Sequence, residues 1–266
     1  MNDGIGALEG ARIFVADVHL SPRAPERGRA FSRLLSRLAR PPLPAELFIL
    51  GDLFDVWLGA SSLDEECHQP ALAALKALTD SGVLVTALQG NRDYLLDGRF
   101  TARSGVRVVA EWLAVALGPF RAYLCHGDQL VVGDRAHQMM RWALRSAVGR
   151  AAAASLPERG IQWAARWLRR TSDSAGRRRQ PEGLSIAAST AARIARGGYD
   201  VIIAGHLHNE RHRAVVVDGR RTDLYTVGAW EDQGSILVFD GERFAFRSFP
   251  IESELRVRGP WPTESS

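Results

Sequence analysis

The sequence predicts an α/β fold, and three features of the chain carry that prediction. From Arg12 to Asp93, short apolar strands alternate with segments of helical periodicity, which is the βαβ rhythm of a parallel sheet. Five of the apolar strands end in Asp, Asn or His. The 266 residues, 46% of them hydrophobic, suffice for one large domain with its own core and an inserted subdomain.

The first part of the chain sets this rhythm. Apolar residues recur with helical spacing from Ala30 to Leu38, and Pro41 follows, so we expect a helix over residues 28–40. The run Leu47–Leu50 reads as a buried strand that delivers Asp52 to the carboxyl end of a sheet. The remaining elements expected here are strands over 12–16 and 83–88 and a helix over 65–80.

From residue 106 the pattern changes. Short strands are predicted over 106–110, 112–117 and 120–125, and a strand over 200–204 follows a long helical stretch. The strands expected over 213–217, 223–227, 235–239 and 243–249 read as a meander. This organisation predicts a core of residues 12–133 and 197–249, a helical cap over 134–196 inserted in it, and a loose tail over 250–266.

The cap segment is strongly basic. Residues 134–196 contain 13 Arg and 4 Asp or Glu, a net charge of +9, so the remainder carries −5 of the total of +4. Helices with an apolar stripe and an arginine face can lie on an anionic membrane surface or frame a pocket for acyl chains. The stripes alone favour an ordinary helical cap with a solvated basic face. A polar stretch over 171–183 is predicted to be a loop within it.

Other global features exclude some classes of protein. There is no run of about 18 apolar residues, so no membrane-spanning helix is predicted, and the N-terminus lacks the pattern of a signal peptide. Cys67 and Cys125 form no pairing motif, which favours a reducing compartment and a packing role for both. His68 and His212 lie outside every motif and receive no predicted role.

The polar residues at the strand ends form one constellation of metal-ligand types. Because carboxyl ends of parallel strands line one crevice, we expect these side chains to meet. Mixed oxygen and nitrogen ligands suit Mn, Fe, Co or Zn rather than Ca. Two metals with a bridging carboxylate, for which Asp52 is the central candidate, predict phosphoester hydrolysis. The predicted ligands are Asp17, His19, Asp52, Asn91, His126, His206 and His208.

The order D-x-H, G-D, G-N-x-D, H-G-D and G-H-x-H resembles the calcineurin-like metallophosphoesterases over residues 12–249. The resemblance implies a four-layer β-sandwich flanked by helices, with an inserted helical cap. It also implies two metal sites that share one carboxylate. One metal would take Asp17, His19, Asp52 and His208, and the other Asp52, Asn91, His126 and His206.

Four sequence blocks resemble one branch of that family more closely. They are Ile49–Gly59, Gly90–Leu96, His126–Leu130 and Gly228–Trp230. That branch hydrolyses UDP-2,3-diacylglucosamine in lipid A biosynthesis. The resemblance implies an enzyme dependent on two Mn²⁺ ions that releases UMP and 2,3-diacylglucosamine 1-phosphate. It also implies a peripheral location on the cytoplasmic face of the inner membrane. It leaves the oligomeric state open.

The third motif carries the predicted catalytic side chains, Asn91, Arg92 and Asp93. Many relatives have His at the position of Arg92, where it can protonate a poor leaving group. Arginine stays charged, but its N–H donors can stabilise phosphoryl oxygens, so a leaving group that needs no acid is expected. Alternatively, Arg92 only pairs with Asp93. The resemblance places Asn91, Arg92, His206, Asp134, His137, Ser172 and Arg179 in substrate binding.

Two departures from the family pattern concern the substrate more than the metals. Leu207 stands between the paired histidines where relatives usually have Thr, and His137 stands where an aromatic residue is common. One alternative is a metallophosphodiesterase for nucleotides or nucleic acid, since an arginine-rich surface binds phosphates without reading sequence. Specific nucleic-acid binding is not expected. Another alternative is a non-catalytic binding module, which the presence of all seven ligand-type residues disfavours.

Overall fold

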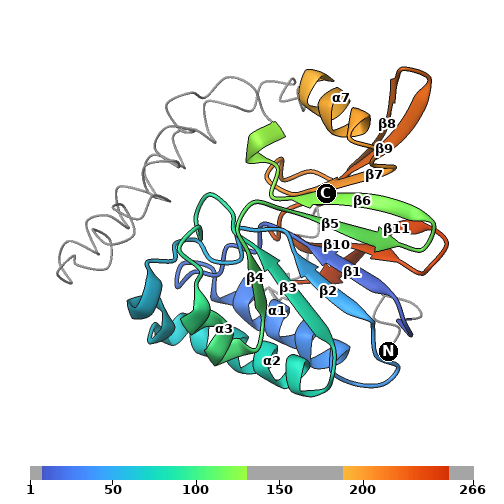
Figure 1. Ribbon diagram of the computed structural model, residues 1–266. Coiled ribbons are helices and arrows are strands. Elements are labelled where there is room, and N and C mark those ends of the chain that lie inside the picture. Colours follow the sequence, from blue (N-terminus) through green and yellow to red (C-terminus); the bar gives the residue numbers. More distant parts are fainter. Residues whose placement is uncertain (1–7, 131–187, 252–266) are drawn as a thin grey trace, which may run out of the picture.

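The computed structural model describes residues 8–130 and 188–251. These residues form two β-sheets packed face to face, with helices on the outer side of each sheet (Figure 1). The layers therefore run helix, sheet, sheet, helix, as the sequence predicts. Of the predicted cap, residues 134–187 lie outside the described residues.

The first sheet has six strands, four of them parallel. Its order is β11-β10-β1-β2-β3-β4, and β10 pairs antiparallel with both β1 and β11. The central strands are buried on both faces, which is why they read as uninterrupted apolar runs. The strands are β1 (Arg12–Val15), β2 (Glu46–Ile49), β3 (Leu84–Leu88), β4 (Arg107–Val109), β10 (Gln233–Phe239) and β11 (Phe244–Pro250).

Helices α1 (Pro25–Leu38), α2 (Gln69–Asp80) and α3 (Gly98–Ser104) cover the outer face of this sheet. Helix α1 begins three residues earlier than predicted, because a proline in the first turn has no intrahelical N–H to lose. Helix α2 begins later than predicted, since Glu66–His68 form the separate 3-10 turn η2. Helix α3 was not predicted.

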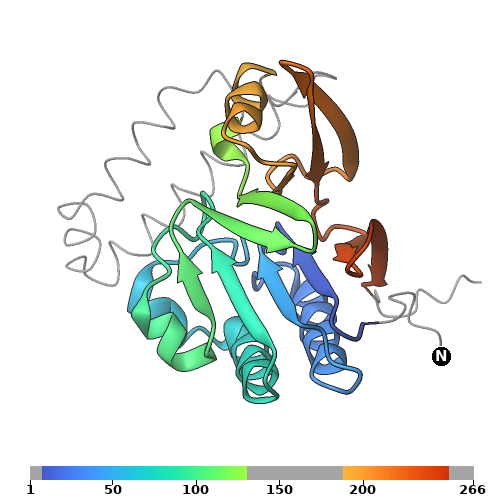
Figure 2. The same cartoon turned by 45° about the vertical axis from the view of Figure 1, so that its right-hand side comes forward.

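The second sheet has five strands in the order β5-β6-β7-β9-β8. Strands β6, β7 and β9 are parallel, and the two edge strands are antiparallel to their neighbours. Helix α7 (Ala188–Arg196) packs on the outer face through Ala191 and Ile194 (Figure 2). The strands are β5 (Trp112–Leu117), β6 (Phe120–Cys125), β7 (Val201–Ala204), β8 (Arg211–Val217) and β9 (Arg220–Thr226).

The predicted C-terminal meander is wrong. Strands β8 and β9 form a hairpin in the second sheet, whereas β10 and β11 form a hairpin in the first. The chain crosses between the sheets after Thr226, and the backbone N–H of Trp230 bonds to the carbonyl of Asp17 at 3.2 Å on the way. Alternating apolar and polar residues identify a strand but do not say which sheet it joins.

The inner faces of the two sheets share one apolar layer. It includes Phe14, Phe48, Leu124, Ile203 and Phe239, with the rings of Phe14 and Phe48 stacked at 5.1 Å. This layer fixes the carboxyl ends of both sheets at the same edge of the molecule.

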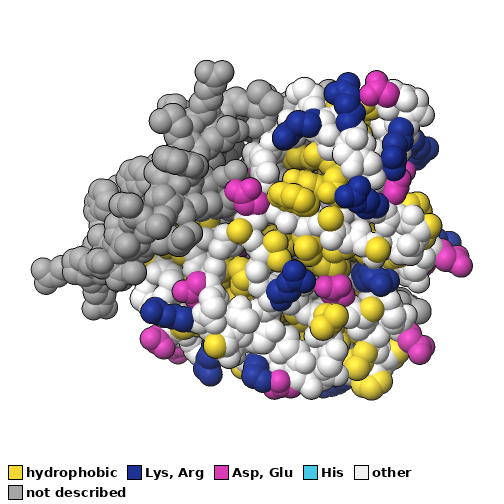
Figure 3. Space-filling view, viewed as in Figure 1, with side chains coloured by type: hydrophobic (Ala, Val, Ile, Leu, Met, Phe, Trp, Pro, Cys, Tyr) yellow, Lys and Arg dark blue, Asp and Glu magenta, His cyan; other side chains and the backbone are white. Residues whose placement is uncertain are grey.

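The outer surface of the described part carries charges of both signs. On the face seen in Figure 3, basic and acidic side chains are interspersed among apolar ones. No helix within residues 8–130 or 188–251 is long and apolar enough to cross a membrane.

Candidate metal centre

Loops that leave both sheets meet at the shared carboxyl edge. His126 directly follows β6, and its Nδ1 lies 2.9 Å from the carbonyl oxygen of Leu50, just beyond β2 of the other sheet. Asp17 follows β1, and its Oδ2 accepts a hydrogen bond of 2.7 Å from the backbone N–H of His206, which follows β7. These bonds bring residues from sequence-distant motifs into one site.

The backbone of these loops is strained at the predicted ligands. Of the six described non-glycine residues with positive φ, five are predicted metal ligands. Residues with a Cβ adopt this backbone conformation uncommonly, and a cluster of such residues is typical of functional sites. The five are Asp17, His19, Asp52, His206 and His208, with φ between 52° and 68°.

Two glycines let the loops approach closely enough. A Cβ on Gly51, whose φ is 88°, would lie 2.6 Å from Nδ1 of His126. A Cβ on Gly90 would overlap the carboxylate and backbone nitrogen of Asp52. Sequence reasoning gave these glycines no role of their own, although the signal was present: each directly precedes a predicted ligand.

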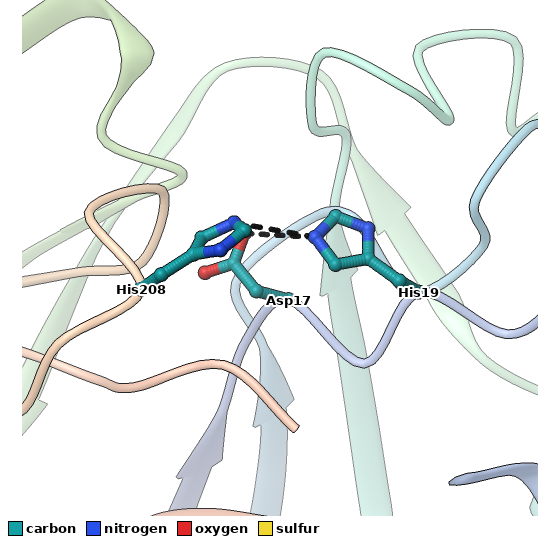
Figure 4. Close-up of side chains that lie close together, drawn as sticks. All are labelled: Asp17, His19 and His208. Carbon is teal, nitrogen blue, oxygen red and sulfur yellow. Dashed lines mark hydrogen bonds and ion pairs between the residues drawn. The ribbon is translucent and has the colours of Figure 1, made fainter. Parts of the chain in front are cut away.

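Asp17, His19 and His208 form the first group of donor atoms, and their side chains point toward one another (Figure 4). The Nε2 atoms of the two histidines are 3.3 Å apart. Oδ1 of Asp17 lies 3.9 Å from Nε2 of His19 and 3.6 Å from Nε2 of His208. Ligands about 2.1 Å from one tetrahedral ion are separated by about 3.4 Å. The group therefore fits three ligands of a single ion.

Asp17 also supplies an unpaired buried oxygen. Its side chain is fully buried, and Oδ1 has no hydrogen-bond partner. A buried carboxylate oxygen is costly to leave unpaired unless a positive charge compensates it. This oxygen faces the two histidine nitrogens, which is the position that a shared cation would fill.

Asp17, Asp52 and His126 form the second group, and Asn91 lies beside it. Nδ1 of His126 carries a proton, because the Leu50 carbonyl it faces can only accept. Its Nε2 lies 2.8 Å from Oδ1 of Asn91 and 3.7 Å from Oδ1 of Asp52. The ring of His206 lies beside it, 5.0 Å between centroids. The oxygen and imidazole groups gathered here are of the types that bind a divalent metal ion.

Three histidines of the site differ in protonation state. Burial lowers the pKa of His19 well below its usual value and that of His206 to about 3, so both are neutral imidazoles, the ligand form. Burial alone would also lower the pKa of His126, but Asp52 and Asp17 outweigh it and raise that pKa to about 9. The two carboxylates thus stabilise a protonated, positively charged His126 at the place where a bound metal would supply the positive charge.

The two carboxylates differ. Burial raises the pKa of Asp17. Burial acts in the same direction on Asp52, but His126 and His19 overcome it and lower its pKa to about 2. Asp17 belongs to both groups of candidate ligands, whereas Asp52 belongs to one of them. Bridging of two metals by Asp52 therefore stays a prediction.

The third motif surrounds Asp52. The backbone N–H of Arg92 donates to Oδ1 of Asp52 at 2.9 Å, and its guanidinium pairs with Asp55 while Nε lies 3.8 Å from Oδ2 of Asp52. Asp55 is a partner that sequence reasoning missed. The alternative in which Arg92 only pairs with Asp93 is wrong, because Arg92 engages Asp55 and Asp52.

Asp93 instead holds the backbone in place. Its buried carboxylate accepts hydrogen bonds from the backbone N–H groups of Gly90, Leu53, Asp52 and Phe54, at 2.8, 2.8, 3.3 and 3.4 Å. Burial and the charge of Asp52 raise its pKa to about 7. These contacts are those of a group that positions the Asp52 loop. A direct catalytic role for Asp93 remains a prediction.

The other predicted substrate-binding residues cannot be placed in this site. Asp134, His137, Ser172 and Arg179 lie outside the described residues and stay predictions. A residue that was not predicted does lie at the rim: Oε1 of Glu231 is 3.5 Å from Nδ1 of His208. Its sequence signal is its position directly after the Gly228–Trp230 block.

The chain is similar to several known proteins. A UDP-2,3-diacylglucosamine hydrolase of Ectopseudomonas mendocina is 32% identical over 241 residues, which cover 90% of this chain and 98% of the relative. The hydrolase of the same name from Stenotrophomonas maltophilia is 34% identical over 236 residues, 86% and 94% of the two chains. The solved structure of an archaeal phosphodiesterase overlaps with a TM-score of 0.46 at 12% identity, covering 90% and 99%.

The strand-end motifs also match a family model. The model described as calcineurin-like phosphoesterase matches residues 12–210, which include every predicted metal ligand. The match extends over most of the 266 residues. The chain therefore belongs to the calcineurin-like phosphoesterase family.

Proposed function

We propose that this chain is a metal-dependent hydrolase that cleaves the pyrophosphate bond of UDP-2,3-diacylglucosamine, releasing UMP and 2,3-diacylglucosamine 1-phosphate. The observation that carries the proposal is the pair of donor groups at the strand ends, in which every member except His208 is buried. Relatives named as UDP-2,3-diacylglucosamine hydrolases align with about nine tenths of the chain, which supports the choice of substrate.

Two divalent ions would be held by the residues of the two donor groups, and Mn²⁺ is the metal we propose. Asp17, His19 and His208 would hold one ion, and Asn91, His126 and His206 the other, with Asp52 shared between them. When bound, such a pair of ions polarises a phosphoryl oxygen and makes a water molecule acidic enough to attack at neutral pH. The donors are oxygens and imidazole nitrogens, which suit Mn²⁺.

Arg92 would act on the substrate diphosphate. Its guanidinium pairs with Asp55 and lies 3.8 Å from the Asp52 carboxylate, which holds the side chain at the edge of the donor groups. Its guanidinium cannot usefully donate a proton, but it can stabilise phosphoryl oxygens through charged hydrogen bonds. A sugar 1-phosphate leaves as a stable anion without protonation, so the attack is proposed at the phosphorus nearer the uridine.

The predicted cap would bind the lipid part of the substrate and determine where the enzyme is located. We propose that the basic cap contacts an anionic lipid surface at the cytoplasmic face of the inner membrane. There Asp134, His137, Ser172 and Arg179 would bind the substrate. The charge of +9 over residues 134–196 supports this attraction.

The test is release of UMP from UDP-2,3-diacylglucosamine in detergent micelles with Mn²⁺. We expect Asp52→Ala to lower the rate at least about a thousandfold, since it removes several kcal/mol of transition-state stabilisation. Asp223→Ala is the matched control. Asp223 is also paired with Arg and His, at 2.8 Å to Arg221 and 2.7 Å to His212, but on the surface of β9.

Each other outcome has a distinct meaning. Hydrolysis of bis-p-nitrophenyl phosphate without release of UMP would reject the lipid substrate and favour the nucleotide phosphodiesterase. Absence of both activities in the metal-loaded protein would favour a binding module.

A further inference from the structure

A third set of metal-ligating side chains lies outside the metal centre, on the turn that leads into α2. Glu65, Cys67 and His68 each offer one donor atom, and these atoms lie within 4.8 Å of one another. Three groups of this kind occur in residues 8–130 and 188–251, and among them this group is the one that contains a thiol. Neither the family motifs nor the proposed hydrolysis uses it.

His68 is fixed in position by its surroundings. Its ring is buried, packs edge-on against Phe54 at 4.6 Å and stacks on Trp57 at 5.8 Å between centroids. Nδ1 lies 2.9 Å from the carbonyl oxygen of Ser62. Because a carbonyl only accepts, Nδ1 carries the proton and Nε2 presents its lone pair. Metal-binding histidines are oriented in this way, by a hydrogen bond from the other ring nitrogen.

The lone pair of His68 faces a carboxylate. Nε2 lies 3.9 Å from Oε2 of Glu65, and the thiol of Cys67 donates a long hydrogen bond of 3.9 Å to the same oxygen. A neutral imidazole nitrogen and a carboxylate oxygen repel each other unless a positive charge lies between them. A cation held between the imidazole nitrogen and the carboxylate oxygen, with the adjacent thiol as a further donor, would remove this repulsion.

We propose that Glu65, Cys67 and His68 bind one divalent cation of the Zn²⁺ or Co²⁺ type. Thiolate and imidazole donors select such ions over Mn²⁺ and Mg²⁺. The separations of 3.9 Å are close to the roughly 3.4–3.8 Å expected for mixed ligands of one tetrahedral ion. The Glu65 side chain is 40% exposed, so it can move to close the site, and solvent can supply a fourth ligand.

The ion would stabilise the turn before α2. Ser62 links the site to this turn, because its carbonyl accepts from His68 and its Oγ accepts from the backbone N–H of Leu58 at 2.9 Å. A ligand that binds only the folded state raises stability with its concentration. Zn²⁺ should therefore raise the melting temperature beyond the effect of a filled metal centre.

The test is titration of the reduced, Mn²⁺-loaded full chain with Co²⁺, followed in the near ultraviolet. A Co²⁺–thiolate bond gives a charge-transfer band that oxygen and imidazole ligands do not give. We expect the band in the wild-type protein and in Cys125→Ser. In Cys67→Ser the band should be absent, and the protein should bind one Co²⁺ ion fewer. Glu65→Gln should weaken Co²⁺ binding at least about tenfold.

Two results would overturn the proposal. Absence of the band in the wild-type protein would mean that Cys67 binds no such cation. A band that persists in Cys67→Ser would place the thiolate ligand elsewhere. The Asp52→Ala variant should keep the band, so the outcome does not depend on the proposed hydrolysis.

Discussion

The loops of the metal centre and the β8–β9 hairpin turn share an unusual backbone but differ in what enforces it. Asp17 and Asp218 both have positive φ, 52° and 51°. Asp17 is completely buried and its neighbours are packed against it, whereas the side chain of Asp218 is 72% exposed and pairs with Arg196 at 3.0 Å. The hairpin conformation is that of an ordinary tight turn, for which Asp and Gly are common.

The two regions differ in whether local backbone preference or contacts between distant segments determine the positive φ. A Cβ on Gly219, beside Asp218, would meet nothing within 4 Å, so this turn depends on local backbone preference alone. The metal-centre loops depend on contacts between distant segments, such as the bond from His206 to Asp17. Only the second kind of loop can hold several like-charged or acceptor side chains together against their repulsion.

Among changes that alter the loop backbone rather than remove a ligand, the largest expected effect comes from Gly90→Ala. The new Cβ would overlap Asp52, so the loop must move, and we expect a loss of about 3 kcal/mol in the free energy of unfolding and of at least about a hundredfold in hydrolysis. Chemical denaturation and the UMP assay measure the two effects.

The matched variant for Gly90→Ala is Gly219→Ala. The hairpin glycine has a φ of 75° but open space around it, so only the left-handed backbone penalty of about 1 kcal/mol applies. Activity should not change. Equal losses of activity in the two variants would show that the close approach of Gly90 to Asp52 is unimportant.

Asp93→Asn should have an intermediate effect. The amide keeps the shape of the carboxylate, but its NH₂ group faces backbone N–H groups that need an acceptor. We expect a loss of about 2 kcal/mol in stability and a ten- to hundredfold loss of activity, through displacement of the Asp52 loop. Denaturation and kinetics of the same preparation test both.

Asp97→Asn is the control for this change. Asp97 also accepts from backbone N–H groups, those of Arg99 at 3.0 Å and Phe100 at 3.4 Å, but as the exposed N-cap of α3. Asn caps helices as well as Asp does, so the change should cost only a few tenths of a kcal/mol. If Asp93→Asn were as stable as the wild type, bound metal normally and yet were inactive, Asp93 would be directly catalytic.

Much of this architecture could be predicted from the sequence, because strand ends and their polar residues are local signals. The apolar run Leu47–Leu50 and the carboxylate that follows it lie within six residues of one another. The division of the C-terminal strands between two sheets could not be predicted, since it depends on the pairing of β10 with β1 across more than 200 residues.

The site shows the same limit. Asp17, His19 and the other predicted ligands were identified by type and motif order, which local sequence preserves. The pairing of Arg92 with Asp55 and the contacts of Asp93 with the backbone were not identified, because they depend on how two loops pack. A charged residue in a motif shows that a partner is needed, but only the fold decides which partner it meets.

The smallest expected effect is a gain in stability from Asp17→Asn. Without a bound metal, the buried Asp17 carboxylate has an unpaired oxygen, and burial disfavours its charge. The neutral amide can keep the hydrogen bond from His206 and tolerates positive φ. Removal of the buried charge should raise the free energy of unfolding of the chelator-treated protein by about 1 kcal/mol, and its melting temperature with it. Added Mn²⁺ should then stabilise the wild type more than the variant.

Asp218→Asn, which changes an exposed carboxylate in the same backbone conformation, should leave both values unchanged. If Asp17→Asn were instead destabilised to the same degree with and without metal, the charge of Asp17 would serve the fold rather than the metal.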